Sequence, residues 1–176
     1  MSWITILYAM MAAFAATLAG IYFVAWVLAP RNVTYLVFVV MAGSAVGLAG
    51  TELWMMKAQT PQEFGEALRW FHVPIWSGFC CFAALVHLRL RPRFLWVGWL
   101  AVGLRTASLV PNFGSAPNLN YTALTGISHV SVLGEPVALV TGDPNPWMLI
   151  GQASQLLALL FVIDGSISML RRGESG

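Results

Sequence analysis

The segment Trp3–Leu28, WITILYAMMAAFAATLAGIYFVAWVL, contains no charged side chain. A helix needs about 20 mostly apolar residues to cross the hydrocarbon core of a bilayer, so this segment predicts a transmembrane helix. Four more apolar segments follow at 34–56, 71–88, 94–110 and 147–170. The fourth is the shortest and contains Arg105. We therefore predict an all-α integral membrane protein with five transmembrane helices in a single domain over residues 1–176.

The composition of the whole chain agrees with a membrane protein. Of its 176 residues, 59% are hydrophobic and 9% are charged, and the mean hydropathy is +0.75. Soluble domains have about 45–50% apolar and about 25% charged residues. These numbers exclude a soluble enzyme and a disordered tail. They also exclude a nucleic-acid binder, although the isoelectric point is about 8.8. The partner implied by composition is the lipid bilayer.

The basic residues predict the orientation. One set of helix ends carries six arginines, and the opposite set carries only two basic residues, Lys57 and Arg69. Because cytoplasmic loops are enriched in Lys and Arg, we expect the N-terminus outside and the C-terminus in the cytoplasm. No basic residue precedes the first span, which argues against a cleaved signal peptide. The six arginines are Arg31, Arg89, Arg91, Arg93, Arg171 and Arg172.

The longest connection, residues 111–145, should lie on the extracytoplasmic side. The 36-residue stretch from Val110 to Asn145 contains no Lys or Arg. Ile127–Leu133 alternates apolar and polar residues, and Gly134-Glu135-Pro136 separates it from an extended run at 137–141. We predict a small β-hairpin in this loop. Loops of this length in compact domains are usually functional, so we expect the binding surface here.

Before the third span, Thr60, Pro61 and Glu63 form the pattern of a helix N-terminus, with an N-cap, a first-turn proline and a capping-box acid. We expect a short helix there that leads into the span. In the first two spans, small residues at four-residue spacing predict close packing between those helices. They are Ala12, Ala16 and Gly20, then Gly43 and Gly47.

Ionisable side chains at membrane depth are expensive and are functional candidates by default. We interpret four polar residues as structural intramembrane groups, with a Glu52–Arg105 pair geometrically feasible: Glu52, Arg105, Gln152 and Asp164. A ligand- or partner-binding surface is predicted from the interfacial and loop residues together with Arg105. Its members are Trp70, His72, Arg105, Asn118, Asn120, Tyr121, His129 and Trp147.

No cofactor is predicted. His72 and His87 have a spacing seen between stacked haem ligands, but two haems need four histidines and the chain has three. A single haem at His72 or His87 is a weak alternative. Thioether and imidazole ligands suit Cu(I), and the candidates for such a site are Met55, Met56, His72 and His129. No phosphate loop, H-E-x-x-H or G-x-S-x-G motif occurs, so we expect no enzymatic activity.

Four segments carry a resemblance: FGEALRWFHVP at 64–74, GLRTASL at 103–109, PNLNY at 117–121 and NPWMLIGQ at 145–152. They resemble the polytopic N-terminal membrane region of bacterial sensor histidine kinases that contain PAS domains. The resemblance spans about residues 52–172 and implies a multi-pass protein of the bacterial cytoplasmic (inner) membrane. The sequence given has no phospho-acceptor histidine box and no ATP-binding glycine boxes. No ligand is implied by the matching residues.

Three functional hypotheses follow. The first is a membrane-embedded sensory or signalling input module without its own catalytic core. The second is a non-catalytic accessory subunit of a larger membrane complex that docks through the extracytoplasmic loop. A distant third is a cofactor, quinone or metal-binding membrane protein that uses His72 and Arg105. The first two imply other membrane protein subunits or self-association as partners.

Overall fold

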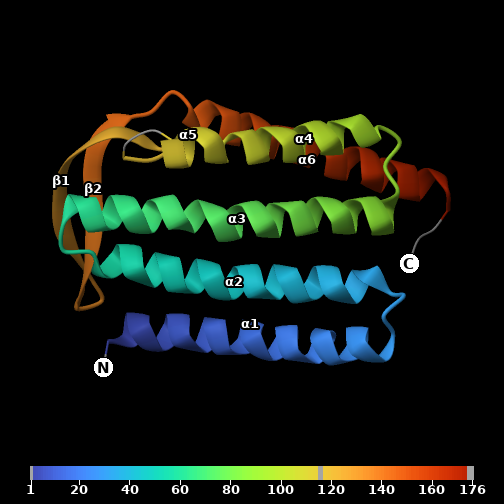
Figure 1. Cartoon of the computed structure of the whole chain (residues 1–176), viewed down its shortest axis with the longest axis horizontal. Coiled ribbons are helices and arrows are strands. Elements are labelled where there is room, and N and C mark those ends of the chain that lie inside the picture. The colour runs from blue at the N-terminus through green and yellow to red at the C-terminus, as the bar shows by residue number, and fades with distance from the viewer. Residues whose placement is uncertain (1, 115–116, 174–176) are drawn as a thin grey trace.

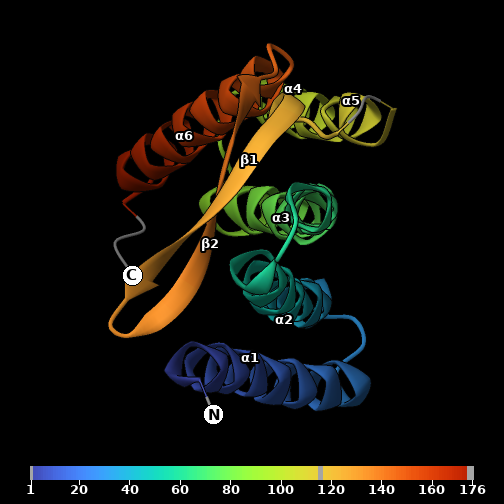
Figure 2. The same cartoon turned by 90° about the vertical axis from the view of Figure 1, so that its left-hand side faces the viewer.

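The computed structural model describes residues 2–114 and 117–173. The bundle contains four long helices (Figure 1): α1 (Trp3–Leu28), α2 (Val33–Lys57), α3 (Pro61–Leu90) and α6 (Met148–Arg171). Helices α1, α2 and α3 alternate in direction, and α6 runs in the same direction as α3. Helix α2 lies between α1 and α3. On the other face of α3 lie α6, α4 (Leu95–Ala107) and α5 (Leu109–Gly114) (Figure 2). Strands β1 (Tyr121–Val132) and β2 (Glu135–Pro144) cross one end of the bundle.

The four long helices are long and apolar enough to cross a membrane. The bounds of α1, α2 and α6 agree closely with the predicted spans. Large apolar side chains are exposed along the four helices, most of all on α1. Lipid tails can cover this apolar surface, so the four helices are those expected of a multi-pass membrane protein. Mostly helical structure with one two-stranded hairpin confirms that part of the predicted fold class.

The fourth predicted span, 94–110, is wrong as a single helix. Helix α4 has 13 residues and ends at Ser108, whose hydroxyl donates to the Arg105 carbonyl at 2.7 Å. Three residues later, Pro111 has no N–H to donate to Ala107, so the regular bonding pattern cannot continue through this point. Helix α5 follows with six residues and lies end to end with α4 along α3 (Figure 1). Four helices, and not five, meet the length expected of a span within the described residues.

The third predicted span, 71–88, and the short helix expected before it form one helix of 30 residues. The predicted cap is present: Thr60 Oγ1 accepts from Glu63 N–H at 3.1 Å, and Glu63 Oε2 accepts from Gln59 N–H at 3.0 Å. The helix continues through Pro74. A Cβ on Gly47 would lie 3.0 Å from Pro74 Cβ, so α2 approaches α3 closely at this proline.

Helices α1 and α2 pack against each other, as expected, but not through the predicted glycines. Neither Gly20 nor Gly43 has an atom within 4 Å of an added Cβ, and Gly47 faces α3. Aromatic rings make the α1–α2 contact instead: Tyr22 stacks on Phe38 with ring centroids 4.8 Å apart. The small-residue spacing therefore indicated the right pair of helices for the wrong physical reason.

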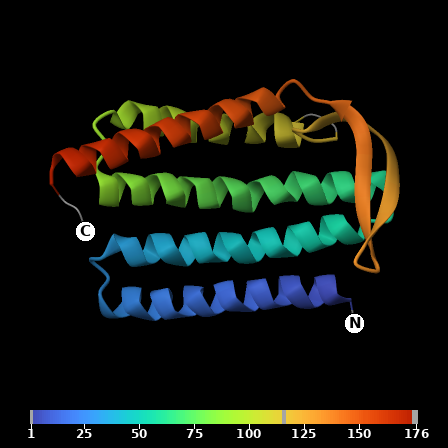
Figure 3. The ribbon, with the colours of Figure 1, turned by 180° about the vertical axis from the view of Figure 1, so that it is seen from behind.

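The predicted hairpin exists and is longer than expected. Strand β1 pairs with β2 in antiparallel register from Tyr121↔Pro144 to Val132↔Glu135, with bulges after Tyr121 and Leu124. The turn consists of Leu133 and Gly134, both at positive φ (49° and 84°), which is the backbone of a type I′ hairpin turn. Seen from behind, the hairpin and the described start of α1 lie at one end of the bundle, and α6 ends at the other (Figure 3).

Candidate functional site

Buried polar side chains gather at the hairpin end of the bundle, where residues 117–120 enter between α3, α5 and the start of α6. We call the four asparagines there the asparagine cluster: Asn112, Asn118, Asn120 and Asn145. Three of them are almost completely buried. A buried amide costs free energy unless its donors and acceptors are paired, so their partners decide what the cluster can do.

Asn118 lies at the centre of this cluster. Its Oδ1 accepts from the N–H groups of Asn120 (2.9 Å) and Tyr121 (3.1 Å), and its Nδ2 donates to the Gly65 carbonyl on α3 at 3.3 Å. This is an Asx turn that also fastens the loop to a helix. With these bonds made, Asn118 is engaged inside the fold and is not free for a ligand.

Asn112 and Asn145 fasten the same loop from two further elements. Asn112 Nδ2 donates to the Arg69 carbonyl at 2.9 Å, and its Oδ1 accepts from Leu119 N–H at 3.2 Å. Asn145 Nδ2 donates to the Asn118 carbonyl at 3.0 Å, and its Oδ1 accepts from Trp147 N–H at 3.1 Å. Together they connect α3, α5 and the N-terminus of α6 through residues 117–120.

Helix α3 supplies two more polar side chains to this region. His72 Nε2 lies 2.9 Å from Asn120 Oδ1, within hydrogen-bonding distance. Arg69 donates from Nε to the Pro117 carbonyl at 3.1 Å. The structure thus brings together four residues of the predicted binding surface, but in a network that holds the loop on the bundle: His72, Asn118, Asn120 and Tyr121.

The other predicted surface residues lie apart from this network. Trp70 is exposed and meets Phe113 edge-on, with centroids 5.6 Å apart. His129 Nε2 lies 3.1 Å from the Ala58 carbonyl, at the turn between α2 and α3. Trp147 is exposed at the start of α6. These three side chains do not form one surface with Asn118.

Two of the predicted intramembrane polar groups have local partners. Asp164 Oδ2 accepts from Phe94 N–H at 2.8 Å, so α6 caps the N-terminus of α4. Glu52 interacts with Tyr8 of α1. The proposed Glu52–Arg105 pair is wrong, because α3 separates α2 from α4 and Arg105 lies on the far side of it. Gln152 is exposed on α6.

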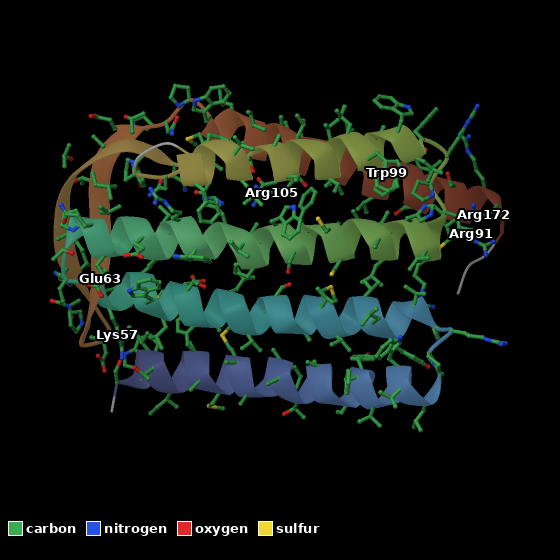
Figure 4. All side chains as sticks on the ribbon, in the orientation of Figure 1. Lys57, Glu63, Arg91, Trp99, Arg105 and Arg172 are labelled. Carbon is green, nitrogen blue, oxygen red and sulfur yellow. The ribbon has the colours of Figure 1, made fainter. Side chains whose placement is uncertain are left out.

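Arg105 is the exception among the buried polar residues. Its side chain is only 4% exposed and lies in the layer between α4 and α3 (Figure 4). Its guanidinium carbon lies 5.8 Å from the centroid of the Phe79 ring, and its Nη1 lies 3.1 Å from where a Cβ on Gly151 would be. Within residues 2–114 and 117–173, its guanidinium has no hydrogen bond and no ion pair.

A groove of about 280 Å³ lies next to this region, on the side of Arg105 toward the start of α4, and Arg105, Phe79 and Gly151 are not among its lining residues. Three helices line it: α3 with Cys80 and Ala84, α4 with Gly98 and Val102, and α6 with Phe161. Cys80 is also close enough to Arg105 for the two groups to interact electrostatically, and Val102 lies one turn before Arg105. The walls of the groove are almost entirely apolar, and the Arg105 guanidinium lies beyond the end marked by Val102.

The weak metal and haem candidates are not brought together. Among the described residues there is no group of three or more His, Cys, Asp or Glu side chains that could hold a metal ion. Met55 packs in the core with Ala67 and Leu68, whereas Met56 lies beside Lys57 at the surface. His72 and His129 are bonded to Asn120 and Ala58, and His87 lines the apolar groove.

Sequence reasoning missed several residues of this end of the molecule. Asn112 and Ser154 were not singled out, Asn145 and Gly151 appeared only within the segment NPWMLIGQ, and Arg69 only as a basic residue at a helix end. Ser154 is fully buried and donates to the Gly151 carbonyl at 2.6 Å. The available signal was the density of asparagines beside prolines, since Asx side chains bond nearby backbone groups. Which distant backbone groups they reach depends on the fold.

Comparison with protein-family models, with curated proteins and with solved structures gives no match.

Proposed function

We propose that the chain is a membrane-embedded sensory or signalling input module of the bacterial cytoplasmic membrane, with the hairpin on the outer face and the C-terminus in the cytoplasm. The orientation is supported by the charges at the two ends of the bundle. Arg91 and Arg172 lie at the end opposite the hairpin (Figure 4). Arginine at that end is typical of the cytoplasmic side.

The observation that carries the proposal is that one hairpin bonds the ends of α1 and α2, packs against α3 and leads directly into α6. Glu135 Oε1 accepts from Trp3 N–H at 3.2 Å at the start of α1. His129 bonds the Ala58 carbonyl between α2 and α3. At the base of the hairpin, Asn145 N–H donates to the Asn120 carbonyl at 2.9 Å, directly before α6. A displacement of the hairpin therefore acts on four helix ends at once.

The opposite end of the bundle is connected as well. Arg172 donates to the carbonyls of Arg91 (3.1 Å) and Leu90 (2.6 Å), which joins the end of α6 to the end of α3. A two-state change in helix packing, biased by a ligand that prefers one state, would reach the cytoplasmic end through these bonds. The resemblance to the membrane regions of sensor kinases supports the same function.

The accessory-subunit hypothesis is favoured by a different observation. The hairpin exposes apolar side chains outside the helices, and Leu133 at its tip is 84% exposed. Exposed apolar patches often mark protein–protein contacts. In this alternative the hairpin docks on the outer face of a partner subunit. The exposed apolar positions are Val130, Val132, Leu133 and Leu139.

Affinity purification from native membranes, with mass spectrometry of the co-purifying proteins, separates the two functions. We compare the wild type with Leu133→Asp, and with Ser131→Asp as the matched control at an exposed polar position two residues earlier, on β1. The sensory function predicts partners with PAS or kinase sequence, recovered equally with all three proteins. Recovery of a stoichiometric non-signalling membrane complex that is lost only in Leu133→Asp would favour the accessory subunit and overturn our proposal.

A further inference from the structure

Arg105 and the apolar groove beside it are not used by the network that holds the hairpin. We propose that the chain binds a long-chain carboxylate with a single apolar chain, with the carboxylate on the Arg105 guanidinium and the chain in the groove between α3, α4 and α6. This inference names a ligand class for the proposed sensory function. Binding itself is argued from Arg105 and the groove, and only the role of the ligand as a signal rests on that function.

The first step of the argument is the state of the charge. Arg105 is only 4% exposed as a residue, and a guanidinium with no anionic or hydrogen-bonding partner among the described residues is costly at membrane depth. The Phe79 ring offers a cation–π contact, which compensates only part of the lost hydration. Arginine presents planar donors that suit bidentate binding of an oxyanion. The missing partner is therefore an oxyanion from outside the chain.

The second step is the shape of the space next to it. The groove runs along α4 from Val102 to Leu95, and Leu95 lies ten residues, or about 15 Å, before Arg105. Its walls are apolar, and Trp99 at its rim is 76% exposed, so the groove opens toward the lipid. Gly151 lets the guanidinium pack against α6, since any larger residue would place a Cβ 3.1 Å from Nη1. An occupant with an anionic head and an apolar body matches both parts.

The third step selects among anionic amphiphiles. A phospholipid phosphate has the same oxyanion chemistry as a carboxylate, but it carries two acyl chains and a glycerol backbone. The groove holds about 280 Å³, which is at the small end of ligand cavities. That volume accommodates part of one chain, with the remainder in the bilayer.

The experiment measures binding of tritiated palmitate to the purified, delipidated full chain in detergent. Hexadecanol, with the same chain and no charge, and phosphatidylglycerol, with a phosphodiester, serve as competitors. We expect saturable palmitate binding that neither competitor reduces. Arg105→Gln should weaken binding at least tenfold, and Arg105→Lys should weaken it less. Arg93→Gln, a matched change at an exposed arginine, should leave it unchanged.

A second variant tests the groove without touching the charge. Ala84→Leu fills the groove wall on α3 and should also weaken palmitate binding at least tenfold. Helix content by circular dichroism and a monodisperse elution profile are required of each variant. The proposal is overturned if palmitate does not bind, if Arg105→Gln binds within twofold of the wild type, if hexadecanol competes as well as palmitate, or if phosphatidylglycerol displaces it. These measurements use no signalling partner, so their failure is distinct from failure of the proposed function.

Discussion

The asparagine cluster and Arg105 are both buried and polar, the cluster at the hairpin end of the bundle and Arg105 farther along it, beside Phe79 of α3. They differ in how their polar atoms are paired. Asn112, Asn118 and Asn145 each bond backbone groups from other elements, whereas the Arg105 guanidinium has no such partner among the described residues. The comparison teaches that burial alone does not identify a binding site. A fully paired polar group stabilises the architecture, and an unpaired one is available to a ligand.

The largest effect should come from breaking the cluster at its centre. Asn118→Ala leaves the N–H groups of Asn120 and Tyr121 and the Gly65 carbonyl without their partner. Because each buried unsatisfied group costs about 1–3 kcal/mol, we expect a loss of about 4 kcal/mol in the free energy of unfolding. Reversible unfolding in mixed micelles, followed by circular dichroism, measures it.

The matched control for this change is Asn32→Ala. Asn32 caps the N-terminus of α2 at the opposite end of the bundle, where its Oδ1 accepts one bond, from Thr34 N–H at 3.3 Å. Loss of an N-cap costs about 1 kcal/mol. Equal losses for the two alanine variants would contradict the central role of Asn118.

The second prediction concerns the packing of the groove below Arg105. A Cβ on Gly98 would lie 2.6 Å from Phe161 Cζ, so Gly98→Ala must displace the ring. Overpacking of this kind costs about 1–3 kcal/mol, and we expect about 2 kcal/mol by the same unfolding measurement. Gly103→Ala, on the same helix with no atom within 4 Å of the added Cβ, is the control. Gly103→Ala should be neutral or stabilising by up to about 1 kcal/mol, since alanine favours helix more than glycine does. A larger loss of stability in Gly103→Ala than in Gly98→Ala would refute the tight contact between Gly98 and Phe161.

The third prediction sharpens the contrast directly. Arg105→Met removes a buried charge that has no described partner, so the ligand-free protein should become more stable, by about 1 kcal/mol, because the desolvation penalty disappears. Arg93→Met, at an exposed arginine near Phe94, should change stability by less than about 0.5 kcal/mol. If Arg105→Met instead destabilised the chain as much as Asn118→Ala, Arg105 would belong to the architecture as the asparagines do.

The smallest effect is expected at the far end of the hairpin. Glu135 bonds the N-terminus of α1 at a partly exposed position, and an acidic group at a helix N-terminus contributes about 0.3–1 kcal/mol. Glu135→Ala should therefore leave global stability almost unchanged while amide hydrogen exchange accelerates in the first turn of α1. Glu135→Gln keeps the acceptor oxygen and should retain most of the protection. Unchanged exchange in Glu135→Ala would show that the hairpin does not hold α1.

Much of the fold could be predicted because it depends on local properties of the chain. Long runs of mostly apolar residues identified the long helices, and the alternation at 127–133 identified the hairpin. The fourth span was predicted from the same apolar signal, but Ser108 and Pro111 interrupt its hydrogen bonding. Apolar composition measures the preference for lipid, whereas helix continuity depends on each N–H and carbonyl along the backbone.

The candidate site was only partly predictable. His72, Asn118, Asn120 and Arg105 were recognised from their residue types, and the structure brings the first three together while Arg105 lies beside Phe79, farther along α3. Which of them are paired could not be inferred, because the partners of Asn118 and Asn145 are up to 53 residues away in the chain. The predicted Glu52–Arg105 pair failed for the same reason: similar depth in two helices does not place them side by side.

By itself, the amino-acid sequence determined that this chain forms long membrane-compatible helices with a hairpin in its longest loop, because hydropathy and turn chemistry act over a few residues. The tertiary structure alone decided three features. Helix α3 separates Glu52 from Arg105, and the buried asparagines fasten residues 117–120 to the helices. Arg105 lies next to an apolar groove without a partner among the described residues. The physical reason is that hydrogen bonds and charge interactions act over a few ångströms in space, and only the packing of the helices brings distant residues within that range.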